Sequence, residues 1–126
     1  MIAFALRQPE ADAAEVLTKA AVRAAAMLGL QSAVLAKVIG VSDSTVSRYK
    51  AASAGIVPQS KSGQLALLLI RVFRSLDPLV GADDARRKAW MRTPNMALGG
   101  VPEQLIQSPD GLVRTLDYLD GMRAVA

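Results

Sequence analysis

The chain has 126 residues, of which 52% are hydrophobic and 21% are charged, and its formal net charge is +4. This is enough apolar material for the core of one domain or two small ones, and the composition is unlike that of intrinsic disorder. Because it has no His and no Cys, the chain lacks the usual ligands of structural zinc, a cysteine nucleophile, a Ser-His-Asp triad and any disulfide. Only a perturbed carboxylate or lysine is left as a general base near pH 7.

No segment has the composition of a membrane span or of a secretion signal. The longest apolar run, Leu65–Ile70, is far shorter than the roughly 20 residues that cross a bilayer. The apolar segment Met1–Leu6 is too short for the hydrophobic region of a signal peptide and has no basic residues before it. Together with the absence of cysteine, this predicts a cytoplasmic protein.

Helical spacing dominates the first sixty residues, and no stretch alternates apolar and polar residues as a strand does. After a leader at residues 1–9, the Ala-rich segment Ala11–Leu28 is predicted to form a helix that Gly29 ends. Two short helices are predicted to follow, Ser32–Ile39 and Asp43–Ala51.

The segment at residues 52–64 separates two parts of different character. It is rich in Gly, Ser and Ala, as connectors are, and Ala prevails before it whereas Leu prevails after it. We therefore predict two packing units, residues 1–60 and residues 61–126. Both have a small excess of basic residues, which permits binding to nucleic acid without demanding it.

The strongest helical pattern of the chain comes after the connector. Apolar residues recur at spacings of three and four over Leu65–Leu76, which predicts an amphipathic helix. A further helix is predicted over Asp83–Arg92 and then a loop over residues 93–100, while Pro102 and Pro109 both suit the first position of a helix. The whole pattern predicts an all-α fold that ends in a small helical unit.

Three residues within the segment 32–51 have the spacing of a helix-turn-helix. Ala36 is small where the second helix crosses the first, Gly40 allows a tight turn, and Val46 fills the space between the helices. Ser42 is suited to cap the second helix. With the apolar positions around them, these residues resemble the Xre/Cro family of helix-turn-helix DNA-binding proteins. A plain helical hairpin with a solvated polar face is the alternative.

The resemblance implies that Asp43–Ala51 is a recognition helix in the major groove of DNA. Arg48 would then contact a guanine or a phosphate, while Lys37 and Lys50 would contact phosphates. The DNA-binding residues that we expect are Lys37, Ser42, Ser44, Thr45, Ser47, Arg48 and Lys50.

Two departures from the family pattern count against DNA binding. The family usually has Ser and then Gln before the first helix of the motif, whereas this chain has Gln31 and then Ser32. A Gln that commonly contacts phosphate is therefore out of place. Asp43 also adds a negative charge near the phosphates.

The second half contains a distinctive block from Trp90 to Pro102, which holds the one Trp of the chain, two Pro and two adjacent Gly. By composition, this block is either a packed corner anchored by Trp90 or a preshaped interaction loop. With the Leu-rich helix before it and Gly111 and Leu116 after it, the block closely resembles the C-terminal toxin-binding domain of Xre/MbcA/ParS antitoxins. Including the helix-turn-helix, the resemblance covers about residues 12–123.

The resemblance implies an antitoxin with two binding partners. Antitoxins of this family pair with RES-domain toxins, which have an ADP-ribosyltransferase-like fold and consume NAD or transfer ADP-ribose. The antitoxin obstructs the active site of the toxin, and the complex commonly represses its own promoter. By this resemblance the chain is not an enzyme, needs no cofactor and no metal, and forms a homodimer within the toxin–antitoxin complex.

We expect the toxin to be blocked sterically by the loop Trp90–Pro102 together with the chain end from Leu119. The two prolines restrict the backbone of the loop, so less entropy is lost on docking, and the paired glycines let main chain approach closely. The toxin-binding residues that we expect are Trp90, Arg92, Thr93, Pro94, Asn95, Leu98, Gly99, Gly100, Leu119, Met122 and Arg123.

Two other functions stay open at this point. One is a stand-alone helix-turn-helix repressor whose second half only dimerises, and the other is a protein inhibitor whose helix-turn-helix has lost DNA binding. An enzyme is the last alternative, because no set of acid and base residues converges in the sequence.

Overall fold

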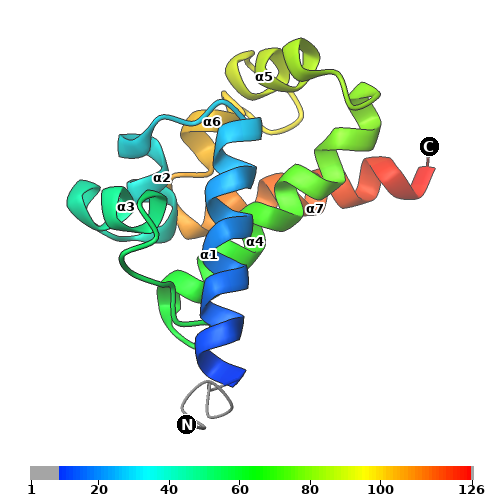
Figure 1. The fold of residues 1–126 in the computed structure, drawn as a ribbon. Coiled ribbons are helices and arrows are strands. Elements are labelled where there is room, and N and C mark those ends of the chain that lie inside the picture. The colour runs from blue at the N-terminus through cyan, green and yellow to red at the C-terminus, as the bar shows by residue number, and fades with distance from the viewer. Residues whose placement is uncertain (1–8, 126) are drawn as a thin grey trace, which may run out of the picture.

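The computed structural model describes residues 9–125, and this part of the chain is mostly helical (Figure 1). The helices, in chain order, are α1 (Pro9–Met27), α2 (Ser32–Ile39), α3 (Asp43–Lys50), α4 (Lys61–Leu76), the 3-10 helix η2 (Asp77–Val80), α5 (Asp84–Arg92), α6 (Pro102–Leu105) and α7 (Pro109–Val125). Within residues 9–125 there is no strand, and one isolated antiparallel bridge joins Asn95 to Gly100. The predicted all-α class is confirmed. None of these helices is long and apolar enough to cross a membrane.

Two helices begin earlier than the sequence pattern predicts. α1 begins at Pro9, which the pattern assigns to a leader, and residues 1–8 of that leader lie outside the described residues. α4 begins at Lys61 rather than at Leu65, because the side chain of the preceding serine accepts a hydrogen bond from the Gly63 N–H at 3.0 Å. Such a cap satisfies an amide that the first turn leaves unpaired, and it makes the connector shorter than predicted.

α4 is the central helix of the fold. It packs against both α1 and α7 and also contacts α2 (Figure 1). Leu69, Val72 and Leu76 of its apolar stripe are fully buried, and a single cluster of buried side chains runs from Leu17 in α1 to Leu119 in α7. The hydrophobic core is therefore continuous across the predicted boundary at residue 60. The division of the chain into two units stays a prediction.

A buried arginine joins α5 to its neighbours. Arg87 is 1% exposed, and its guanidinium donates to Asp77 Oδ1 at 2.7 and 2.9 Å and to Asp84 Oδ1 at 3.0 Å. It also donates to the Met27 carbonyl at the end of α1, at 3.2 Å, and lies 5.5 Å from the centre of the Phe73 ring. Two carboxylates and a carbonyl thus stabilise a charge that is costly to bury alone.

Candidate functional site

α2 and α3 form the helix-turn-helix that the sequence predicts (Figure 1). Gly40 ends α2 with a φ of 73°, and its N–H and that of Val41 both donate to the Ala36 carbonyl. A side chain would strain this left-handed backbone conformation, so glycine suits the turn. Ala36 and Val46 are buried, with exposed fractions of 3% and 0%. The predicted roles of Ala36, Gly40 and Val46 are confirmed.

The exposed face of α3 carries a series of hydroxyl groups. Ser42 caps the helix: its Oγ accepts from the Thr45 N–H at 3.2 Å and lies 3.0 Å from Ser44 Oγ. Arg48 Nη2 donates to Thr45 Oγ1 at 3.1 Å, and Arg48 remains exposed. Short hydroxyl side chains around one guanidinium are groups that contact bases and phosphates in a major groove.

Most of the predicted DNA-binding residues are accessible. Lys50 Nζ donates to Ser32 Oγ at the start of α2. Lys61, which is not among the predicted DNA-binding residues, lines a hollow of about 300 Å³ together with Lys37. The pattern assigns Lys61 to the connector, which hides its place beside the helix-turn-helix. Of the predicted residues, those that are exposed are Lys37, Ser42, Ser44, Ser47, Arg48 and Lys50, and Thr45 is half-buried. Their contact with DNA stays a prediction.

The loop between α5 and α6 is a closed, hydrogen-bonded turn. The Asn95 N–H donates to the Gly100 carbonyl at 2.8 Å, and the N–H groups of Gly99 and Gly100 donate back to the Asn95 carbonyl at 2.9 and 3.3 Å. The Asn95 side chain accepts from the Leu98 N–H at 3.0 Å. From α7, Arg114 Nη2 donates to the Leu98 carbonyl at 2.6 Å. The protein itself therefore sets the shape of this loop.

The tip of the same loop presents a hydrophobic side chain to solvent. Met96 is 99% exposed, whereas Leu98 is 5% exposed and anchors the loop. Leu98 is among the residues predicted to bind the toxin, whereas Met96 is not. In an irregular loop, periodicity does not tell which side chain turns inward, so no signal in the sequence separates the two.

Two of the predicted toxin-binding residues are buried. Leu98 and Leu119 are 5% and 0% exposed, so their side chains pack within the protein, and their contact with the toxin stays a prediction. Trp90 is half-buried against the core, and Arg92 Nη2 donates to the Gly29 carbonyl at 3.2 Å, which ties α5 to the turn after α1. The other predicted residues are exposed or half-buried: Thr93, Pro94, Asn95, Gly99, Gly100, Met122 and Arg123.

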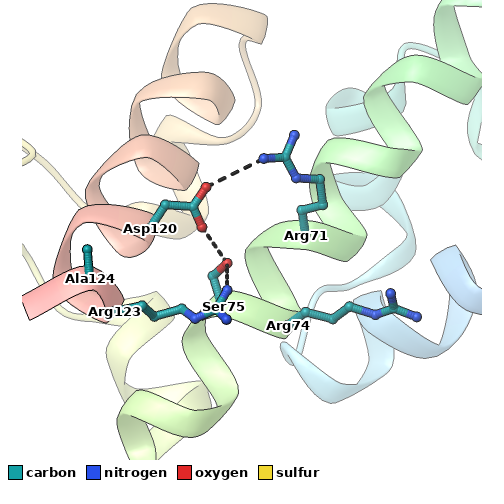
Figure 2. Close-up of a pocket in the computed structure, with 6 residues that line it drawn as sticks. All are labelled: Arg71, Arg74, Ser75, Asp120, Arg123 and Ala124. Atoms are coloured by element: carbon teal, nitrogen blue, oxygen red, sulfur yellow. Dashed lines mark hydrogen bonds and ion pairs between the residues drawn. The ribbon is translucent and has the colours of Figure 1, made fainter. Parts of the chain in front are cut away.

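The last turns of α7 are tied to α4 (Figure 2). Arg123 Nη1 donates to Ser75 Oγ at 3.2 Å, and Ser75 Oγ donates to Asp120 Oδ1 at 2.7 Å. Arg71 Nη2 lies 3.5 Å from Asp120 Oδ2. These residues surround a hollow of about 500 Å³. Over the range from residue 9 to residue 125, no group of three or more acidic side chains is placed to hold a metal ion.

The helix-turn-helix surface has a counterpart in a known family. The sequence model of a protein family, the antitoxin Xre-like helix-turn-helix domain, matches residues 7–71, which is more than half of the chain. The chain belongs to the Xre-like antitoxins. The turn at Gly40 and the cap at Ser42 are thus features of an antitoxin's helix-turn-helix domain.

The loop and the chain end lie in the second matched region of this antitoxin. The model of the antitoxin Xre/MbcA/ParS C-terminal toxin-binding domain matches residues 75–124. The antitoxin therefore has a helix-turn-helix domain followed by a toxin-binding domain, in the predicted order. The two matched ranges meet near the end of α4, further along the chain than residue 60. The comparison with curated proteins gave no match.

Proposed function

We propose that this antitoxin neutralises a RES-domain toxin by blocking the toxin's active site, and that it represses its own promoter through α2 and α3. The observation that supports the first part is the closed loop between α5 and α6, which presents Met96 to solvent within the toxin-binding domain. A preshaped loop loses little conformational entropy when it docks. In this proposal the antitoxin acts by binding and carries out no chemistry itself.

Steric inhibition suits a loop of this kind. RES-domain toxins, as the family resemblance implies, hold NAD in a cleft, and a blocker of a cleft needs a rigid element with an accessible tip. Leu98 and Leu119 act indirectly, by fixing the loop and α7. The toxin-binding residues that we propose are Trp90, Arg92, Thr93, Pro94, Asn95, Met96, Gly99, Gly100, Met122 and Arg123.

Repression requires two copies of the helix-turn-helix. Dimers with this motif bind two half-sites about one helical turn apart, so we propose a homodimer within a cytoplasmic toxin–antitoxin complex and a palindromic operator. Lys37, Lys50 and Lys61 contact phosphates, and Arg48 contacts a base or a phosphate.

The test is inhibition of the toxin that is encoded beside this antitoxin. NAD consumption by the purified toxin is measured against increasing amounts of antitoxin, and we expect full inhibition at a fixed stoichiometry. Met96→Glu is expected to weaken inhibition about tenfold or more, because burying an unpaired charge at an interface is costly. Ala51→Glu, at an exposed position outside the proposed toxin-binding residues, is the control.

Two results would contradict the proposal in different ways. Inhibition that Met96→Glu leaves unchanged would contradict the role of the loop. A toxin that is neither bound nor inhibited would contradict the pairing itself and would favour a stand-alone repressor.

A further inference from the structure

An apolar hollow lies between α1 and α4, outside the loop described above. Its volume is about 450 Å³, and its lining is mostly apolar, with Val16, Leu67 and Ile70 beside the charged side chains of Asp12 and Arg74. Val16 and Leu67 are 68% and 48% exposed. Single apolar side chains are common on protein surfaces, but two beside one apolar hollow indicate an interaction surface. We call this hollow the α1–α4 groove.

The groove is a neighbour of the hollow between α4 and α7 that Figure 2 shows, and Arg74 lines both. Arg71, Arg74 and Arg123 line this second hollow, which we call the arginine pocket. Asp120 is the one carboxylate in its lining. Asp120 pairs with Arg71, whereas Arg123 donates to the neutral hydroxyl of Ser75.

The arginine pocket has more positive than negative charge. Arg74 makes no hydrogen bond or ion pair with any residue between 9 and 125, and its side chain extends away from Asp120 in Figure 2. Three guanidinium groups and one carboxylate leave two positive charges without a counter-charge in the lining. Guanidinium groups bind carboxylates and phosphates through paired N–H donors. With Asp12 of the groove included, the two hollows together have three guanidinium groups and two carboxylates, so the excess of positive charge lies at the arginine pocket. The surface therefore favours a ligand that is apolar along its length and acidic at one end.

We propose that the α1–α4 groove and the arginine pocket together dock an amphipathic segment of the toxin. Apolar side chains of that segment fill the groove, and its carboxylates meet Arg74 and Arg123. The inference rests on the proposed function only for the identity of the partner. It adds a second contact region to the loop between α5 and α6, and two linked contacts bind more tightly than either one alone.

The charge and apolar character of the surface favour an acidic toxin segment over three other ligands: a phosphate group, residues 1–8 of the chain and a second copy of the chain. A phosphate group would use the arginine pocket and leave the apolar groove unfilled. Residues 1–8 of the chain contain Arg7 and no Asp or Glu, so their charge opposes that of the pocket. A second copy of the chain carries a net charge of +4, which opposes its close approach to a basic surface.

The experiment uses the full-length antitoxin and its toxin in isothermal titration calorimetry. Arg74→Glu reverses the charge that both hollows share and removes no bond to residues 9–125, so the fold is kept. We expect the affinity for the toxin to fall about tenfold or more and the salt dependence of binding to decrease. Leu67→Glu tests the groove separately and is expected to weaken binding as well. Arg86→Glu is the matched control, because Arg86 is exposed, lies outside both hollows and gives the same change in net charge.

Each alternative gives a distinct result. Equal toxin affinities for the Arg74→Glu and Arg86→Glu variants overturn the proposal. The proposal is also overturned if the surface is a phosphate site. In that case sodium pyrophosphate binds tightly and Leu67→Glu does not change the toxin affinity. It is overturned as well if the surface mediates self-association, in which case Arg74→Glu abolishes dimers in light scattering and leaves toxin binding unchanged.

The failure of this inference is distinguishable from the failure of the proposed function. If Met96→Glu weakens toxin binding and Arg74→Glu does not, the loop alone docks the toxin and only this inference is overturned. If the unmodified antitoxin binds no toxin, both are overturned.

Discussion

The arginines of the two halves of this antitoxin differ in what they contact. In the helix-turn-helix, Arg48 is exposed and its guanidinium bonds to Thr45 in the same helix. In the toxin-binding domain, Arg87 and Arg114 each donate to the backbone of a different element. The first kind is available to a ligand, and the second kind holds the fold together. A basic residue in a sequence is therefore a candidate ligand contact only once its partners within the protein are known.

The largest effect that would test this difference is expected at Arg87. Arg87→Ala removes the ion pairs with Asp77 and Asp84 and the bond to the Met27 carbonyl. Breaking a buried ion pair costs about 3–5 kcal/mol, and we expect the free energy of unfolding in urea to fall by that amount. Arg86→Ala, at the exposed neighbouring position, is expected to change it by less than about 0.5 kcal/mol. Equal stability of the two variants would remove the distinction between the two kinds of arginine.

A smaller effect is expected at Arg48, where a substitution should change the affinity for DNA and not the stability of the fold. Arg48→Ala is expected to weaken binding to promoter DNA by about 1–3 kcal/mol if Arg48 reads a base, with unfolding unchanged. The affinity is measured by fluorescence anisotropy at several salt concentrations, and it is expected to fall as salt rises, because counterions are released on binding. Arg23→Ala, on the exposed side of α1, is the control. If the affinity for promoter DNA changes neither with the salt concentration nor in the Arg48→Ala variant, the helix-turn-helix does not contact DNA.

Arg114 is expected to affect toxin binding indirectly, through the loop that it holds, although it contacts only the protein itself. Arg114→Ala removes the 2.6 Å bond to the Leu98 carbonyl, at a cost of about 0.5–1.5 kcal/mol in stability. We expect faster hydrogen exchange at the Gly99 and Gly100 amides and weaker toxin binding, since a looser loop loses more entropy on docking. Arg114→Lys, which can restore one donor, is expected to recover part of the protection. If the exchange rates of these amides do not change in Arg114→Ala, the hydrogen bond from Arg114 does not determine the shape of the loop.

The smallest effect is expected at an exposed pair in α5. Lys88 Nζ lies 3.0 Å from Asp84 Oδ2, and the hydrogen bond from Lys88 is the main cause that lowers the pKa of Asp84 below 3.8. Because the folded-state pKa is depressed, the stabilisation from this carboxylate is present above about pH 4 and is lost as the pH falls through the folded pKa. Lys88→Met is expected to raise the Asp84 pKa in an NMR titration, with little change in stability at neutral pH. A pKa that stays depressed would assign the effect to Arg87 alone.

The sequence by itself determined the features that depend on neighbours along the chain. The spacing of Ala36, Gly40 and Val46 predicted the turn between α2 and α3, and the recurrence of apolar residues over Leu65–Leu76 predicted most of α4. Helical periodicity, capping and glycine turns involve residues only a few positions apart, so their signals survive in the sequence. The same local patterns carried the resemblance to the antitoxin family, which the family comparison confirmed.

Only the tertiary structure decided which side chains stay accessible. In one loop Met96 faces solvent and Leu98 is buried. Arg87 donates to the Met27 carbonyl at the end of α1, and Arg74 lines two hollows. These contacts join residues far apart in the chain, and their geometry is set by how the side chains of α1, α4 and α7 interlock. Local periodicity carries no information about that packing, which is why the helices could be predicted and the exposure of Met96 and Arg74 could not.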